Sequence, residues 1–185
     1  MTKEICKARR HLLKAGMAFA LNGLNARPAL ANFVHKTSRL HELSFYNLHT
    51  GESLKTKYWA EGEYLPDAMA DINHILRDFR TNLVLPIDPQ LLDLLNGLPS
   101  TLGTAQPFQI ISGYRSPATN FTLAANSDGA AKGSLHMQGK AIDLRIEGTA
   151  LGDLHQAAMD LQGGGVGYYP KSNFVHVDVG RVRHW

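Results

Sequence analysis

The alternation of apolar and polar positions predicts a domain that combines strands with helices. Alternating stretches on either side of Thr50-Gly51-Glu52 indicate a β-hairpin over residues 43–49 and 53–59. Two later segments repeat apolar residues with a helical period, one opening at Pro66-Asp67 and the next at Asp88-Pro89. Strands are expected at 108–111, 141–146 and 174–179, and another helix at about 149–161. Because helices precede most of the strands, we expect an α+β fold with a small central antiparallel sheet flanked by helices.

Two of the predicted strands carry polar side chains on a single face. In the strand at 141–146, isoleucine and leucine share one face and Asp143 lies on the other. In the strand at 174–179, the valines take the core face, which leaves His176 and Asp178 on the opposite one. If the two strands are neighbours, these three polar side chains point into one cleft.

A histidine upstream completes a candidate metal site. His136 stands seven residues before Asp143, and Gly139 between them permits a tight turn. The two imidazoles of His136 and His176, together with Asp143, suit Zn²⁺ with an open fourth position for water. Zinc held in this way supplies the chemistry that a peptidase needs. The spacing alone leaves another interpretation open, in which the histidines are structural and Asp143 pairs with a lysine.

Composition limits the kind of metal site. The 185 residues are 44% hydrophobic and 19% charged, which is typical of one globular domain. The single cysteine, Cys6, excludes a disulfide framework and a cysteine-based structural zinc site. Any metal must therefore be held by histidines and carboxylates.

The positive charge of the chain is concentrated at its N-terminus. Residues 1–31 contain six basic side chains and one acidic one, whereas residues 32–185 carry a net charge of −2. The string at 8–14, with its arginine pair and following lysine, resembles a twin-arginine export signal. A short apolar stretch follows at 15–21, and Ala29-Leu30-Ala31 has the pattern of a cleavage site. An ordinary amphipathic helix is the alternative interpretation of this segment.

This N-terminal pattern predicts the domain organisation and the partners. We expect a twin-arginine signal peptide at 1–31, recognised by the twin-arginine export machinery, and a single domain at 32–185. The apolar stretch is too short for a stable membrane span. Since the basic excess belongs to the signal, it does not indicate a nucleic-acid partner.

Three strings in the remaining domain resemble one family. In order, they are Ser112-Gly-Tyr-Arg-Ser116, Ser134-x-His136-x-x-Gly139-x-Ala141-x-Asp143 and Phe174-Val-His176-Val-Asp178. They resemble the peptidase family M15 group, especially its branch of twin-arginine-exported murein endopeptidases, over roughly residues 40–185 and the signal. The resemblance implies a compact fold of the M15 and hedgehog type, with one zinc ion held by His136, Asp143 and His176. It also implies hydrolysis of peptide bonds in peptidoglycan stem peptides or their cross-links in the periplasm.

The resemblance also implies roles for residues around the metal. Arg115 matches the arginine that holds a substrate carbonyl or carboxylate, where a fixed cation stabilises an oxyanion. A salt bridge that closes the loop is its alternative role. Ser134 is a candidate for orienting His136, or a simple turn residue. Asn120 and Tyr168 are candidate substrate contacts in the cleft. Tyr168 and Tyr169 are both candidates for its wall, although core or rim packing accounts for the two tyrosines equally well.

The general base departs from the family pattern. Better-known members carry a glutamate or aspartate three residues before the last histidine ligand, and here that position is Asn173, whose amide cannot accept a proton. Asp178 is the preferred candidate for a base or a ligand-orienting group. Pairing with Arg181 or Arg183 is its alternative, and His184 is the reserve candidate for the base.

The sequence thus predicts an exported zinc metallopeptidase that cleaves peptidoglycan. One alternative is a non-catalytic cell-wall binding module, in which the same residues hold a structural metal and Asn173 marks a lost base. Another is a secreted metallohydrolase that acts on a different polymer.

Overall fold

The computed structural model describes residues 40–126 and 133–185. The predicted signal peptide and its cleavage site lie outside these ranges. In the part of the chain that is described, no helix is long and apolar enough to cross a membrane.

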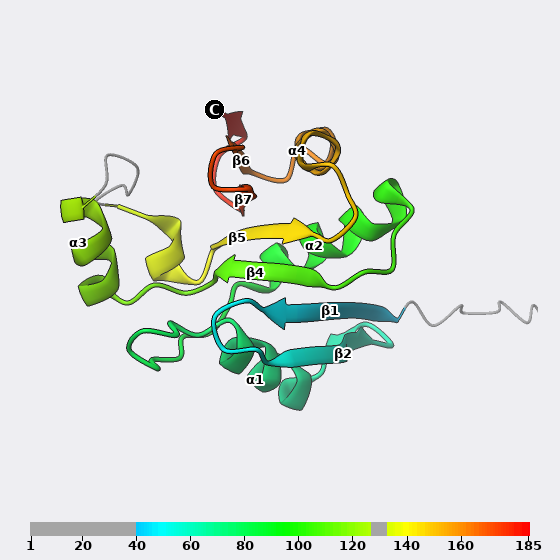
Figure 1. The fold of residues 1–185 in the computed structure, drawn as a ribbon. Helices are drawn as coiled ribbons and strands as arrows, with labels where there is room; N and C mark the ends of the chain where they lie inside the picture. The colour runs from blue at the N-terminus through cyan, green and yellow to red at the C-terminus, as the bar shows by residue number, and fades with distance from the viewer. Residues whose placement is uncertain (1–39, 127–132) are drawn as a thin grey trace, which may run out of the picture. The chain divides into compact units, whose positions relative to one another are not determined.

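A mixed sheet of eight strands, in the order β3-β2-β1-β4-β5-β7-β6-β8, forms the centre of the domain (Figure 1). The strands are β1 (His41–Asn47), β2 (Ser53–Ala60), β3 (Glu63–Tyr64), β4 (Phe108–Ser112), β5 (Ala141–Ile146), β6 (Gly165–Tyr169), β7 (Phe174–Asp178) and β8 (Arg183–His184). Most neighbours are antiparallel, but β1 pairs with β4 and β6 pairs with β8 in parallel. The α+β class is confirmed. The sheet is mixed rather than wholly antiparallel because a long connection containing helices brings β4 back alongside β1.

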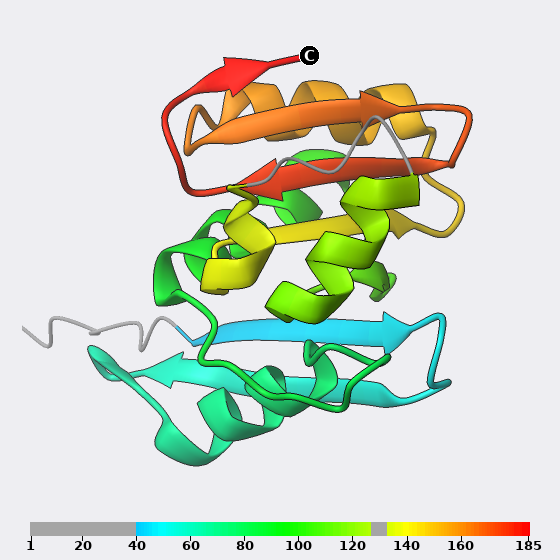
Figure 2. The same cartoon turned by 90° about the vertical axis from the view of Figure 1, so that its left-hand side faces the viewer.

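Helices lie on both faces of the sheet. They are α1 (Pro66–Ile75), α2 (Pro89–Leu102), α3 (Pro117–Asn126) and α4 (Leu151–Asp160), with a short 3₁₀ helix, η1 (Leu135–Gln138). Figure 2 shows α3 and η1 in front of the sheet and α2 and α4 behind it. Pro89 at the first turn of α2 and the Asp88 carboxylate, which accepts the backbone N–H of Gln90 at 3.0 Å, explain why α2 begins there.

The core lies between the sheet and the helices behind it. On β5 and β7 the aliphatic residues Ile142, Leu144, Val175 and Val177 are buried in this core. The alternation along each strand turns Asp143 and His176 to the opposite face. The two residues are also direct cross-strand partners in the antiparallel register, which sets their side chains next to each other.

A buried aspartate anchors the loop that joins β4 to α3. Asp78, which is 1% exposed, accepts the backbone N–H of Ser116 at 2.9 Å and that of Arg80 at 3.0 Å. Burial disfavours the charged form, but hydrogen bonds from Ser116 and Thr119 outweigh it and lower the pKa of Asp78 to about 2. The loop that carries Arg115 is therefore fixed at Ser116.

We expect Asp78→Asn to lower the free energy of unfolding by about 2 kcal/mol at pH 7. The folded-state pKa of Asp78, about 2, lies below its ordinary value of 3.8, so this stabilisation is present above about pH 4. It is lost as the pH falls through 2. Urea unfolding across this range, with the exposed Asp71→Asn as control, measures the effect. If the difference in unfolding free energy between Asp78→Asn and the wild type stays constant down to pH 2, the lowered pKa of Asp78 is contradicted.

Candidate metal centre and substrate cleft

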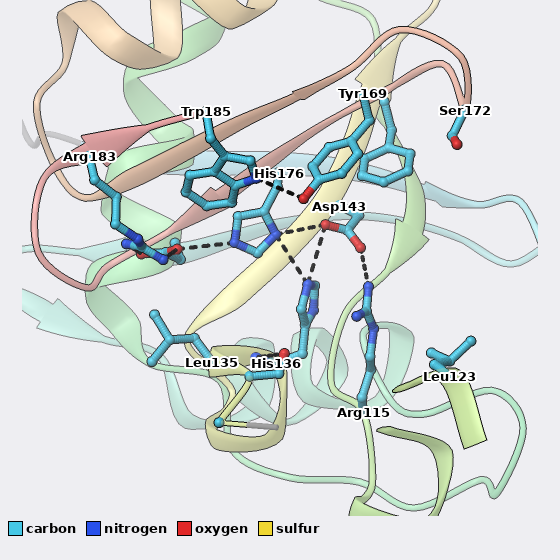
Figure 3. Close-up of a pocket in the computed structure, with 14 residues that line it drawn as sticks. Arg115, Leu123, Leu135, His136, Asp143, Tyr169, Ser172, His176, Arg183 and Trp185 are labelled. Carbon is cyan, nitrogen blue, oxygen red and sulfur yellow. Dashed lines mark hydrogen bonds and ion pairs between the residues drawn. The ribbon is translucent and has the colours of Figure 1, made fainter. Parts of the chain in front are cut away.

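A cleft of about 530 Å³ opens on the side of the sheet that carries η1 (Figure 3). Its walls come from β5, β6, β7, β8, α3, η1 and the loop after β4. Seven of the candidate site residues from the sequence line it: Arg115, Ser134, His136, Asp143, Tyr169, His176 and Asp178. Segments that are far apart in the sequence thus meet at one place.

Three of these side chains direct nitrogen or oxygen atoms at a common point. Nε2 of His136 lies 3.3 Å from Nδ1 of His176 and 3.3 Å from Oδ1 of Asp143. Nδ1 of His176 lies 2.8 Å from the same carboxylate oxygen. A tetrahedral zinc ion, with bonds of about 2.0–2.1 Å, separates its ligand atoms by about 3.3 Å. The spacing and the chemistry of this buried donor set therefore fit zinc.

The fold around η1 fixes the orientation of His136. The Ser134 hydroxyl accepts the backbone N–H of His136 at 3.4 Å, and Gly139 ends the helix with a positive φ of 67°. Nδ1 of His136 donates to the Gly113 carbonyl at 2.7 Å, which leaves Nε2 to face the other two side chains. Ser134 thus positions the backbone of His136, whereas the imidazole is oriented by Gly113, which the sequence did not single out. Burial lowers the pKa of His136, which favours the neutral form that binds metals.

Asp178 holds the far side of the His176 ring. Its Oδ2 lies 3.0 Å from Nε2 of His176. The same carboxylate accepts hydrogen bonds from the backbone N–H groups of Gly165 and Gly180 and from the Arg183 guanidinium. Burial disfavours its charge, but these bonds hold the pKa of Asp178 well below its usual range. A buried carboxylate that resists protonation is suited to orienting a ligand and poorly suited to acting as a general base.

Arg115 pairs with the second carboxylate oxygen of Asp143. Its Nε also donates to the Ser112 hydroxyl at 2.8 Å. The pair is largely buried, with side-chain exposures of 15% for the arginine and 3% for the aspartate. Burial disfavours ionised Asp143, but the two imidazoles and the guanidinium keep its pKa well below the usual range. Burial likewise opposes the charging of His176, but hydrogen bonds to the flanking carboxylates raise its pKa.

Asn120 and Tyr168, the two candidate substrate contacts, do not line the cleft. Asn120 is buried on α3. Tyr168 is the cross-strand partner of Val175. Its ring packs against the His155 ring of α4 with a centroid distance of 4.9 Å, on the face of the sheet opposite the cleft. Because neighbouring residues of a strand point to opposite faces, Tyr169 lines the cleft instead.

Asn173 serves the turn between β6 and β7. Its φ of 55° is in the left-handed region, which asparagine tolerates better than most residues. It does not line the cleft, and neither does His184. Among the described residues that line the cleft, Asp143 and Asp178 are the only carboxylates, and both are engaged by the partners given above.

Comparisons with known proteins indicate one family. The sequence model of the family described as peptidoglycan L,D-endopeptidase MepK matches residues 34–185. The peptidoglycan L,D-endopeptidase MepK of Escherichia coli K12 is 46% identical over 177 residues, which cover 96% of each chain. The probable peptidoglycan L,D-endopeptidase MepK of Haemophilus influenzae is 38% identical over 178 residues, covering 96% of this chain and 94% of that protein. The match to the family model spans all of the described residues.

Proposed function

Because this chain belongs to the M15 peptidase family described as peptidoglycan L,D-endopeptidase MepK, we propose that it cleaves L,D peptide bonds of peptidoglycan at a zinc ion held by His136, Asp143 and His176. The family confirms the prediction of a murein endopeptidase, made from the three sequence strings. The observation that carries the zinc proposal is the convergence of three ligand atoms, 2.8–3.3 Å apart, inside a cleft.

Some residues of the cleft are placed to hold the metal, and others are placed to hold the substrate. Zinc, when bound, supplies Lewis-acid polarisation of the scissile carbonyl and a more acidic water. The Gly113 carbonyl and Asp178 fix the two imidazoles in the tautomers that leave a lone pair for the metal. Arg115 fixes Asp143 and, since it also lines the cleft, can donate its remaining N–H groups to a substrate oxygen.

We also propose that the protein works in the periplasm, with peptidoglycan as its partner. The twin-arginine string at Arg9-Arg10 supports export by the twin-arginine machinery. This part of the proposal rests on the sequence, because the string lies outside the described residues.

The role of Asp178 gives a direct prediction. Asp178→Asn keeps the size of the side chain but removes the charge that orients His176, so zinc affinity is expected to fall about 10- to 100-fold. Competition with a chromophoric chelator measures the affinity, and thermal unfolding reports whether the variant folds. Asp153→Asn, an exposed substitution on α4, is the control. Wild-type zinc affinity in folded Asp178→Asn would show that the carboxylate has no orienting role.

Digestion of purified murein sacculi tests the proposed function. We expect the zinc-loaded protein to release muropeptides whose masses and linkage correspond to cleavage of L,D bonds, and we expect a chelator to stop the release. A binding module with a structural metal would bind zinc and sacculi but release no product. A hydrolase for another polymer would also leave the stem peptides intact.

A further inference from the structure

An aromatic hydroxyl in the cleft takes no part in holding the three candidate ligands. This group is the hydroxyl of Tyr169, which comes from β6. The Tyr169 ring stacks on Phe174 at a centroid distance of 4.5 Å. Figure 3 shows its hydroxyl directed into the part of the cleft beside His176 and Asp143.

The hydroxyl is held in place by Trp185. The indole N–H donates to Oη of Tyr169 at 2.8 Å, and the indole ring packs on the His176 ring with a centroid distance of 5.4 Å. Trp185 is itself fixed to β6, since its backbone N–H donates to the Val166 carbonyl at 3.2 Å. Gly167 makes this approach possible, because a Cβ there would lie 2.7 Å from the indole ring. The indole therefore sets the direction of the tyrosine hydroxyl.

This hydrogen bond leaves the proton of the hydroxyl available. A phenol has one donor and two acceptor lone pairs, and the indole uses an acceptor lone pair of Tyr169. Among the described residues, no acceptor takes the tyrosine proton. Arg115 reaches Asp143 from the opposite side of the cleft and is already paired with it (Figure 3). A neutral donor thus faces the cleft from the side opposite Arg115.

We propose that Tyr169 is a further catalytic residue, and that Trp185 is the residue that positions it. The inference rests on the proposed function. As the scissile carbonyl is attacked, negative charge develops on its oxygen, and the Tyr169 O–H donates a hydrogen bond to that oxygen without transferring its proton. A donor that is fixed in advance stabilises the negatively charged oxygen of the transition state more than it stabilises the uncharged carbonyl of the substrate. Trp185 contributes by fixing the hydroxyl before substrate binds.

Two variants with a matched control test the inference on a purified L,D-cross-linked muropeptide. Tyr169→Phe removes only the hydroxyl, and we expect kcat to fall about 100-fold with KM within about twofold, the effect of losing one oxyanion donor. Trp185→Phe keeps a ring but removes the indole N–H, and we expect a fall of about 10-fold in kcat. Tyr168→Phe, whose ring faces α4, should match the wild type.

A second measurement separates catalysis from a structural role. We expect Tyr169→Phe to weaken the binding of a phosphinic peptide, whose tetrahedral centre carries negative oxygens, about 100-fold. Zinc affinity and thermal stability should stay at the wild-type level, whereas a structural role would change one of them.

Folded, zinc-loaded Tyr169→Phe with unchanged kcat and unchanged phosphinate affinity would overturn the role of Tyr169. A wild-type kcat for Trp185→Phe, together with a reduced kcat for Tyr169→Phe, would overturn the positioning role of Trp185. A wild-type protein that cleaves no muropeptide would instead overturn the proposed function, and this inference with it.

Discussion

Replacing either histidine of the metal centre is expected to remove both zinc and activity. In His136→Ala or His176→Ala, two ligand atoms remain of the three that surround the proposed ion, and the open cleft can supply only water in place of the third. We expect less than 0.1 equivalent of zinc per chain after dialysis, and a loss of kcat/KM of more than about 1,000-fold, because the Lewis acid supplies several kcal/mol of transition-state stabilisation.

The control for these variants is a histidine outside the cleft. His74 lies on α1 with a 60% exposed side chain, so His74→Ala should bind zinc and cleave like the wild type. Metal content by mass spectrometry and rates on the muropeptide are measured on the same preparations. Full activity in His136→Ala or His176→Ala would contradict the assignment of the ligands.

Loss of Arg115 is expected to have the second-largest effect. Arg115→Ala removes the guanidinium from Asp143 and leaves a carboxylate that is 3% exposed without its permanently charged partner. Breaking a buried ion pair from one side costs about 3–5 kcal/mol, which we expect in the unfolding free energy of the metal-free protein. We also expect kcat/KM to fall about 100- to 1,000-fold, since a cation beside the reacting carbonyl is lost together with the alignment of a ligand.

Two further substitutions separate charge from geometry at this position. Arg115→Lys keeps the charge but cannot reproduce the guanidinium contacts to both Ser112 and Asp143, so it should recover only part of the activity. Lys55→Ala breaks an exposed pair with Glu42, 3.1 Å apart, and should change neither stability nor rate measurably. An Arg115→Ala protein as stable and active as Lys55→Ala would show that the buried pair has no such role.

The alternation of side chains along β5 and β7 was the most informative signal in the sequence. It required only that Asp143 and His176 face away from the aliphatic core, and the antiparallel register then made them cross-strand neighbours. The convergence of His136 on the same point followed from a short turn ending at Gly139. The geometry of the candidate ligands was therefore predictable because it depends mainly on local strand and turn rules.

The hydrogen-bond partners of the site residues depend on packing between segments that are far apart in the sequence. The Gly113 carbonyl carries no side-chain signal, although it orients His136. Asp178 was open to two interpretations because its low pKa depends on hydrogen bonds with His176 and Arg183 and with backbone N–H groups, which only the folded chain brings together around it. The sequence did not separate Tyr169 from Tyr168 as the cleft residue, because β6 is rich in glycine, which lowers the expectation of a strand, and only a defined strand assigns its two tyrosines to opposite faces.

A zinc titration of the metal-free protein tests the central claim most directly. Rates of cleavage of the L,D-cross-linked muropeptide are measured as zinc is added in steps of a fraction of an equivalent. Three donor atoms around a single point predict no cleavage without metal, a linear rise, and a break at one zinc per chain. Full cleavage by the metal-free protein in the presence of chelator, or none after one equivalent of zinc has bound, would contradict the account.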